Sequence, residues 1–309
     1  MAAAVNAEPT TGKHFAPESS ETTSSSSASR VDWISFASVV STVSVVLLHA
    51  NGCYWDFSYT EMYWKTANII DGVFFFAVPV FFMISGATLV NFYERYGLGT
   101  YFKKRIIKTV IPYVFWSLFG VAFQVFYLKN IDASEVTVSY LLTGLSSGSL
   151  VEIYWFFIPL FSVYLSIPLF AAVPEERRKS VFTYVSVAAF IVNGTLPFVA
   201  GLFELPISAS LTISVGAEYL FYIPTGYLLS HYEVSPKVKT ALYASGLVGL
   251  IIHLVGTYEL SFEAGSVVQT FKSDTIATTM MYSVAVFLLL KETGGYSCGL
   301  IGSPGLCNS

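Results

Sequence analysis

The stretch VDWISFASVVSTVSVVLLHA, residues 31–50, decides the fold class. From Trp33 to Ala50 its only ionisable side chain is His49, and the other residues are apolar or small and uncharged. Crossing the hydrocarbon core of a bilayer as a helix takes about 20 such residues. The stretch therefore predicts a membrane-spanning helix over residues 33–50. It also raises the question of why a titratable ring lies at the end of that helix.

The composition extends this prediction to the whole chain. The 309 residues are 54% hydrophobic and 12% charged, whereas soluble domains carry about 25% charged residues. We therefore expect an all-α polytopic integral membrane helical bundle whose main partner is the lipid bilayer. The net charge of −4 gives no basic excess that would favour nucleic acid. The three cysteines, Cys53, Cys298 and Cys307, lack metal-ligand spacing, so we expect no metal site.

Apolar runs predict eight spans. They lie near residues 33–50, 68–90, 109–128, 154–174, 180–203, 212–230, 239–257 and 274–290. Residues 1–31 are rich in serine and lack an apolar run, which predicts a disordered tail. The prediction is thus a tail over 1–31, a transmembrane domain over 32–291 and a short Gly-rich tail over 292–309.

The lysines and arginines predict the topology. The loop after the second span holds five of them, and the run PEERRK after the fourth, interpreted as a solvated loop, holds three more. The alternate loops offer only Lys65, Lys129 and Lys272. Because basic loops stay on the cytoplasmic side, the N-terminus is predicted to be cytoplasmic. That orientation would bring several side chains to the outer half of the bundle, namely His49, Asp71, Glu152, Trp155, Glu218 and His253.

Four stretches in this order are similar to one known family. They are the first span ending in His-Ala, VFFFAVPVFFMISGATLV, the basic YFKKRIIKTVIPYVFW, and the Trp-Phe-rich YWFFIPLFSVYLSIPLF. Together they resemble the membrane acyltransferase 3 family over roughly residues 32–291. Each motif alone is unspecific, since aromatic runs are common in membrane helices, but their order and spacing are specific.

The resemblance implies a function. Such proteins are inner-membrane enzymes of bacteria, or eukaryotic relatives of them. They move an acyl group, usually acetyl, from acyl-CoA to a hydroxyl of a cell-envelope polysaccharide or lipid-linked sugar. It implies that His49 is essential and that the loop with Lys104 and Arg105 binds the acyl-CoA. No dissociable cofactor is implied beyond this donor substrate.

The chemistry of acyl transfer fits the residues at the predicted outer end. A hydroxyl is a weak nucleophile at neutral pH, and histidine titrates in the range that suits a general base. A carboxylate, Asp71 or Glu152, could orient the ring and stabilise its cation, and Trp155 could contact the substrate. Plainer interpretations remain. Both carboxylates could cap helix N-termini, Trp155 could belong to an aromatic belt, and topology alone could explain the basic loop.

Three departures from the family pattern leave rival functions open. Family members usually end with a further span that bears a Tyr-Leu-x-His-like motif, whereas KETGGYSCGLIGSPGLCNS is too short and Gly-rich for a full span, so we expect a truncated or divergent C-terminus. The family usually has an arginine eleven residues before the histidine, and here Ser38 takes that place. Some members carry a histidine just before the Trp-Phe pair of the fourth span, where this chain has Ile153. One rival is a transporter of a small solute, which proteoliposome flux without acyl-CoA would favour. The other is an inactive relative that serves as a membrane partner, which activity gained by Ser38→Arg would support.

Overall fold

The described chain consists of helices joined by loops. The computed structural model describes residues 21–203, 205–206, 208, 211–216 and 218–301, with side chains from residue 33 to 294 within these ranges. These residues contain no strand, which confirms the predicted all-α class. The helices are α1 Glu21–Ala50, α2 Met62–Phe74, α3 Ala77–Leu89, α4 Leu98–Arg105, α5 Ile111–Phe123, α6 Val138–Ser147, α7 Phe157–Ala171, α8 Glu175–Ala189, α9 Leu196–Leu202, α10 Tyr222–His231, α11 Pro236–Ala264 and α12 Ala277–Ile301.

Short 3₁₀ and π segments connect several of these helices. Those of 3₁₀ type are η1 Gly52–Trp55, η2 Val90–Glu94, η5 Ala133–Glu135, η6 Glu152–Tyr154 and η8 Tyr219–Phe221, and the π segments are η3 Ile106–Val110, η4 Gln124–Leu128 and η7 Phe190–Thr195. Proline accounts for the position of η3. Pro112, at the start of α5, has no N–H for the carbonyl of Lys108, so the ordinary helical bond is missing there.

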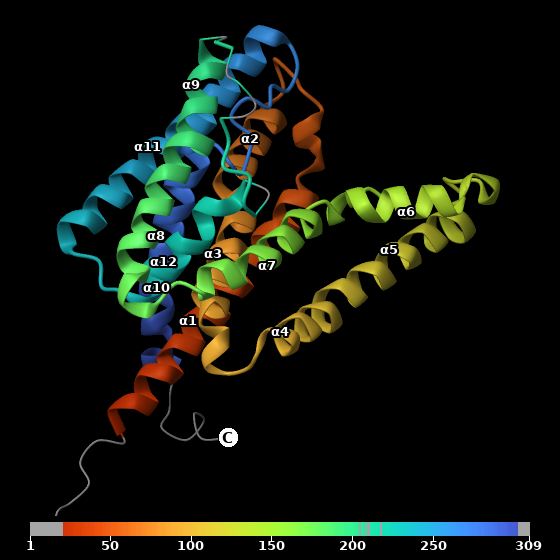
Figure 1. Ribbon diagram of the computed structural model, residues 1–309. Coiled ribbons are helices and arrows are strands. Elements are labelled where there is room, and N and C mark those ends of the chain that lie inside the picture. The colour runs from red at the N-terminus through yellow and green to blue at the C-terminus, as the bar shows by residue number, and fades with distance from the viewer. Residues whose placement is uncertain (1–20, 204, 207, 209–210, 217, 302–309) are drawn as a thin grey trace, which may run out of the picture.

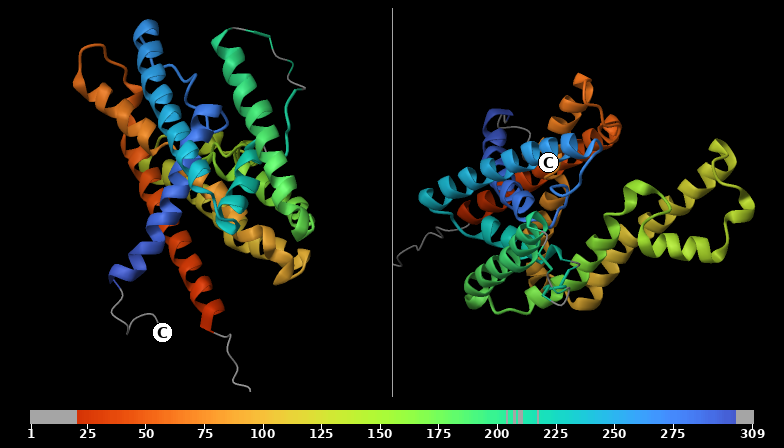
Figure 2. Two further views of the ribbon diagram at one scale, coloured as in Figure 1. Left: turned by 90° about the vertical axis from the view of Figure 1, so that its left-hand side faces the viewer. Right: turned by 90° about the horizontal axis from the view of Figure 1, so that it is seen from above.

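The bundle core lies around α3, α10 and α12, whereas α5 and α6 project from it as a hairpin (Figures 1 and 2). Phe82, Met83, Ile223 and Phe287 are among the fully buried side chains of that core. Helices α3 and α10 approach closely at Gly86, where an added Cβ would collide with the carbonyl of Ile223 in α10. Small residues let two helix backbones approach in this way.

Six helical stretches are long and apolar enough to cross a membrane, counting only the described residues. They are Trp33–Ala50, Met62–Glu94, Leu98–Leu128, Glu152–Ala171, Glu175–Leu202 and Pro236–Ala264. Six of the eight predicted spans coincide with them. The chain is therefore a membrane protein by its helices, whereas eight spans and the cytoplasmic N-terminus stay predictions.

The other two predicted spans have no such helix. Within residues 212–230 the helix α10 covers only the last part, since Gly216 and Glu218 take positive φ angles of 68° and 73°. A helix of L-residues cannot continue through that conformation. The span predicted over residues 274–290 corresponds to α12, which runs into Lys291 and Glu292 and is not among the six.

The predicted tails overlap the described helices at both ends. Helix α1 begins at Glu21 and α12 ends at Ile301, so helix occupies the described parts of segments 1–31 and 292–309. Residues 1–20 and 302–309 lie outside the described residues, and the tail prediction for them stays a prediction.

One residue of the basic run after the predicted fourth span is not solvated. Arg178 at the start of α8 is only 7% exposed. Its guanidinium donates to the Asn91 side chain at 2.8 Å, to the Val173 carbonyl at 2.9 Å and to the Tyr227 hydroxyl at 3.2 Å. A buried charge needs such partners. The interpretation as a solvated loop is thus wrong for Arg178, which ties α8 to η2 and α10.

Candidate active site

A cavity of about 670 Å³ opens where the end of α1 meets α2, α3, the segment before α7 and the loop before α12. This volume falls within the range of about 300–1,000 Å³ that is usual for small-molecule sites. Apolar and aromatic side chains line most of it, with five titratable groups among them. The lining residues are Thr42, Val45, Leu48, His49, Gly52, Trp55, Asp71, Phe75, Val78, Phe81, Glu152, Ile153, Trp155, Phe156, Lys272 and Asp274.

His49 reaches the cavity from the last turn of α1. Its side chain is exposed and makes no hydrogen bond or ion pair with another described residue. An imidazole with free ring nitrogens that faces a cavity can accept a proton from a bound molecule.

Asp71 lies in α2 with its carboxylate paired to a lysine. The distance from Lys272 Nζ to Asp71 Oδ1 is 2.9 Å, and both side chains are largely buried. The rings of Tyr54 and Trp55 lie 4.0 and 4.1 Å from the same Nζ atom, so cation–π contacts add to the ion pair. Asp71 was one of two carboxylates expected to orient His49, and in the structure its ion-pair partner is Lys272.

Asp274 is a second buried carboxylate, which sequence reasoning missed. Its side chain accepts a hydrogen bond from the Tyr219 hydroxyl at 3.2 Å, and its backbone carbonyl accepts one from Tyr222. It lies in the loop before α12, outside the six candidate spans. Burial raises its pKa to about 7, although the bond from Tyr219 and the charge of Lys272 oppose that shift. Burial likewise lowers the pKa of Lys272, against the attraction of Asp71 and Asp274.

Glu152 and Trp155 come to the cavity from η6 and the residue after it. Glu152 is exposed and forms no ion pair with a described residue. Trp155 is 43% exposed, with one part against the cavity wall. The cavity therefore brings together four of the predicted site residues, namely His49, Asp71, Glu152 and Trp155.

A helix break shapes part of the cavity wall. Helices α2 and α3 are separated at Phe75 and Phe76, because Pro79 has no N–H to bond the carbonyl of Phe75. Phe75 lines the cavity at this break and packs against His253 of α11, with 5.3 Å between ring centroids. His253 itself is buried and is not part of the lining.

The two predicted donor-binding residues lie elsewhere. Lys104 and Arg105 end α4 and do not line the cavity. The Lys104 ammonium lies 3.8 Å from the centre of the Tyr96 ring, and the Arg105 guanidinium lies 5.8 and 5.4 Å from those of Tyr101 and Tyr164. Helix α4 lies toward the same end of the bundle as the start of α1 (Figure 1). Their binding of acyl-CoA stays a prediction.

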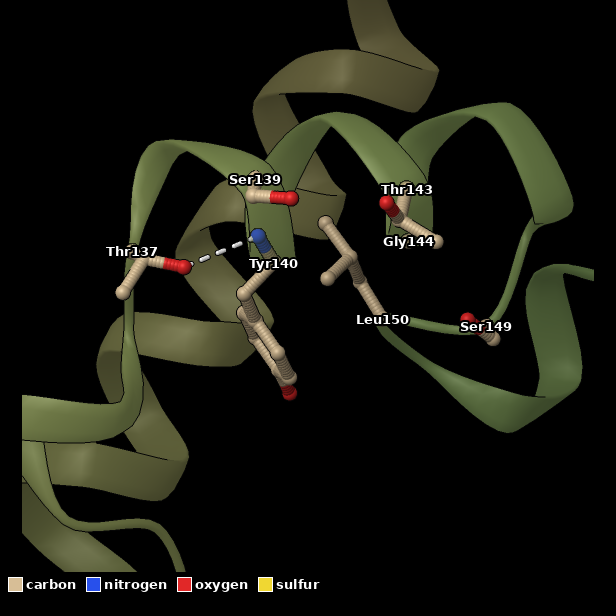
Figure 3. Close-up of a pocket in the computed structure, with 7 residues that line it drawn as sticks. All are labelled: Thr137, Ser139, Tyr140, Thr143, Gly144, Ser149 and Leu150. Atoms are coloured by element: carbon tan, nitrogen blue, oxygen red, sulfur yellow. Dashed lines mark hydrogen bonds between the residues drawn. The ribbon is translucent and has the colours of Figure 1, made fainter.

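A second hollow, of about 380 Å³, lies beside α6 in the projecting hairpin (Figure 3). Its lining is Thr137, Ser139, Tyr140, Thr143, Gly144, Ser149 and Leu150. Thr137 caps α6 by accepting from the backbone N–H of Tyr140 at 3.1 Å. This lining holds no carboxylate, histidine or lysine, so it offers no base for proton transfer near neutral pH.

The acyltransferase domain family matches residues 31–297, which is most of the chain. The chain belongs to this acyltransferase family. The matched region contains every residue of the cavity lining, and the resemblance to the membrane acyltransferase 3 family is thereby confirmed. No curated protein and no solved structure shows significant similarity to this membrane acyltransferase.

Ser38, which takes the place of the family's usual arginine, forms its hydrogen bond within its own helix. Ser38 donates its hydroxyl to the carbonyl of Ile34 at 2.8 Å. The cation of the cavity is instead Lys272, from the loop between α11 and α12. The sequence carried a weak signal for it, since KSD at residues 272–274 interrupts an otherwise apolar and hydroxyl-bearing segment.

Proposed function

We propose that this membrane acyltransferase transfers an acyl group, most simply acetyl, from acyl-CoA to a hydroxyl of a cell-envelope polysaccharide or lipid-linked sugar. The observation that carries the proposal is the cavity of the family-matched chain, whose lining contains His49 together with Asp71 and Glu152, the two carboxylates predicted from the sequence. The family resemblance adds the donor, the acceptor and the inner membrane of a bacterium as the location.

His49 acts in this proposal as the general base. It takes the proton of the acceptor hydroxyl while the hydroxyl oxygen bonds to the carbonyl carbon of the thioester. The carbon–sulfur bond then breaks, and the CoA sulfur leaves with its electron pair and receives the proton from His49. Glu152, the unpaired carboxylate of the lining, stabilises the imidazolium between these two proton transfers. Asp71 fixes Lys272 in the cavity wall.

The donor and the acceptor place different demands on the protein. The phosphates of acyl-CoA need positive charge, which the last turn of α4 supplies through Lys103, Lys104 and Arg105. The acceptor needs stacking surfaces and hydrogen-bonding groups, which Trp155 and the carboxylates of the cavity supply. We assign the first role to α4 and the second to the cavity.

The test replaces His49 by a side chain of similar size without a base. Membranes with the wild-type chain, His49→Gln or His231→Gln receive acetyl-CoA labelled in the acetyl group, and label in the glycan fraction is counted. Loss of a general base lowers rates by about 10²–10⁴-fold, so we expect label from the wild type and His231→Gln only. His231 lies at the end of α10, outside the cavity lining. Equal label from His49→Gln would contradict the proposal.

A further inference from the structure

We propose that the acceptor subsite of the cavity takes an uncharged sugar unit and discriminates against sugar units that carry a carboxylate. This inference rests on the proposed function and names the class of its acceptor. It depends on the charges that line the cavity and on which of them are already neutralised.

The ionisable groups of the lining are mostly acidic. Asp71, Glu152 and Asp274 stand against a single lysine, Lys272. With all four ionised their formal charge is −2, and it is −1 when Asp274 holds a proton. His49 adds no charge in the state that binds the acceptor, because a base must be neutral before it takes a proton. An anionic acceptor would therefore enter a cavity of its own sign.

Lys272 does not attract an anionic ligand strongly enough to offset the negative charge of the lining. Its ammonium is paired with Asp71 at 2.9 Å, and its side chain is largely buried. The rings of Tyr54 and Trp55 cover it at 4.0 and 4.1 Å. An anion that recruited Lys272 would have to leave the buried carboxylate of Asp71 without its partner, which is costly in a low-dielectric site.

The other lining groups suit an uncharged polyol. Trp55 and Trp155 offer aromatic faces for the C–H faces of a sugar ring, and Trp155 is 43% exposed. Glu152 is exposed and unpaired among the described residues, so its oxygens are free to accept hydrogen bonds from hydroxyls. Hydrogen bonds from sugar hydroxyls to a carboxylate are stronger than hydrogen bonds between neutral groups.

The test compares two ligands that differ at one carbon, methyl β-D-glucoside and methyl β-D-glucuronide. Each is titrated into the purified full chain in lipid nanodiscs at low salt and followed by tryptophan fluorescence, to which the cavity residues Trp55 and Trp155 contribute. Repulsion by one or two partly screened charges predicts a dissociation constant about tenfold higher for the glucuronide. Raising the salt concentration should shrink this ratio.

A matched pair of variants tests whether the cavity causes the discrimination. Glu152→Gln removes one charge from the lining and should lower the ratio to about threefold. Glu135→Gln removes an exposed charge that does not line the cavity and should leave it unchanged. The inference is overturned by equal or tighter binding of the glucuronide, by a ratio insensitive to Glu152→Gln, or by no saturable binding of either ligand. Failure of the proposed function would instead show as absent acetyl transfer.

Discussion

At the scale of single residues, Lys272 changes the role that Asp71 can have. The two are 201 positions apart in the chain, and no local pattern announces that they pair. The sequence placed Asp71 at the same depth as His49, and the structure does bring both to one cavity. Depth along a predicted span could be derived from residue counting. The choice of partner could not, because it depends on how α2 and the loop before α12 approach one another.

The pairing of Lys272 with Asp71 leads to a prediction about stability. Removing one member of a buried ion pair leaves an unpaired charge and costs about 3–5 kcal/mol. Lys272→Met should therefore lower the unfolding temperature strongly, and Lys272→Met/Asp71→Asn should recover much of the loss. Thermal unfolding of the purified variants in one detergent checks this, with the exposed Lys237→Met as control. Equal losses in the single and double variants would show that the pair is not coupled.

At the scale of the helices, the sequence predicted the long apolar helices well, but it predicted only some of the places where helices are interrupted. Long apolar runs such as residues 239–257 predicted helices, because a chain within a bilayer must satisfy its backbone hydrogen bonds internally. The loop within residues 212–230 escaped prediction, since its residues are apolar enough for a span. Its positive φ angles at Gly216 and Glu218 follow from tertiary packing. The close approach of two helix backbones at Gly86 and Gly226 depends on that packing as well.

The contact between α3 and α10 offers a test of that packing. A Cβ on Gly226 would collide with the carbonyl of Met83. Since neither backbone can move without separating the helices, Gly226→Ala should destabilise the fold by about 1–3 kcal/mol or more. Gly99→Ala in α4 meets nothing within 4 Å and should be neutral or gain up to about 1 kcal/mol. Unfolding temperatures of the two variants measure the difference, and equal values would contradict the close approach.

At the scale of the whole molecule, the acidic cavity and the basic helix α4 lie at separate places in the bundle. The basic residues were predicted to share one side from topology alone, and the cavity residues from their depth in the spans. What the sequence could not give was the lining itself, because it comes from α1, α2, α3, η6 and a loop near the end of the chain.

Because α4 and the cavity lie apart, a substitution in α4 should change the KM for the donor without changing the KM for the acceptor. Lys104→Gln removes a charge from α4 without touching the cavity. If α4 binds the CoA phosphates, the KM for acyl-CoA should rise about three- to tenfold, since one charge-assisted hydrogen bond is lost at an exposed site. The KM for the acceptor should stay unchanged. Steady-state assays of Lys104→Gln and of Lys237→Gln as control measure both constants. An unchanged KM for acyl-CoA would place the donor elsewhere.

The loop between α11 and α12 has a consequence for the design of shortened versions of this enzyme. A truncation before residue 265 would keep His49, Glu152 and Trp155, the residues most visible in the sequence. It would remove Lys272 and Asp274 from the cavity wall and take away α12, whose Met280 and Phe287 lie in the core. The smallest catalytic unit must therefore extend through α12, and libraries of truncations should begin from that boundary.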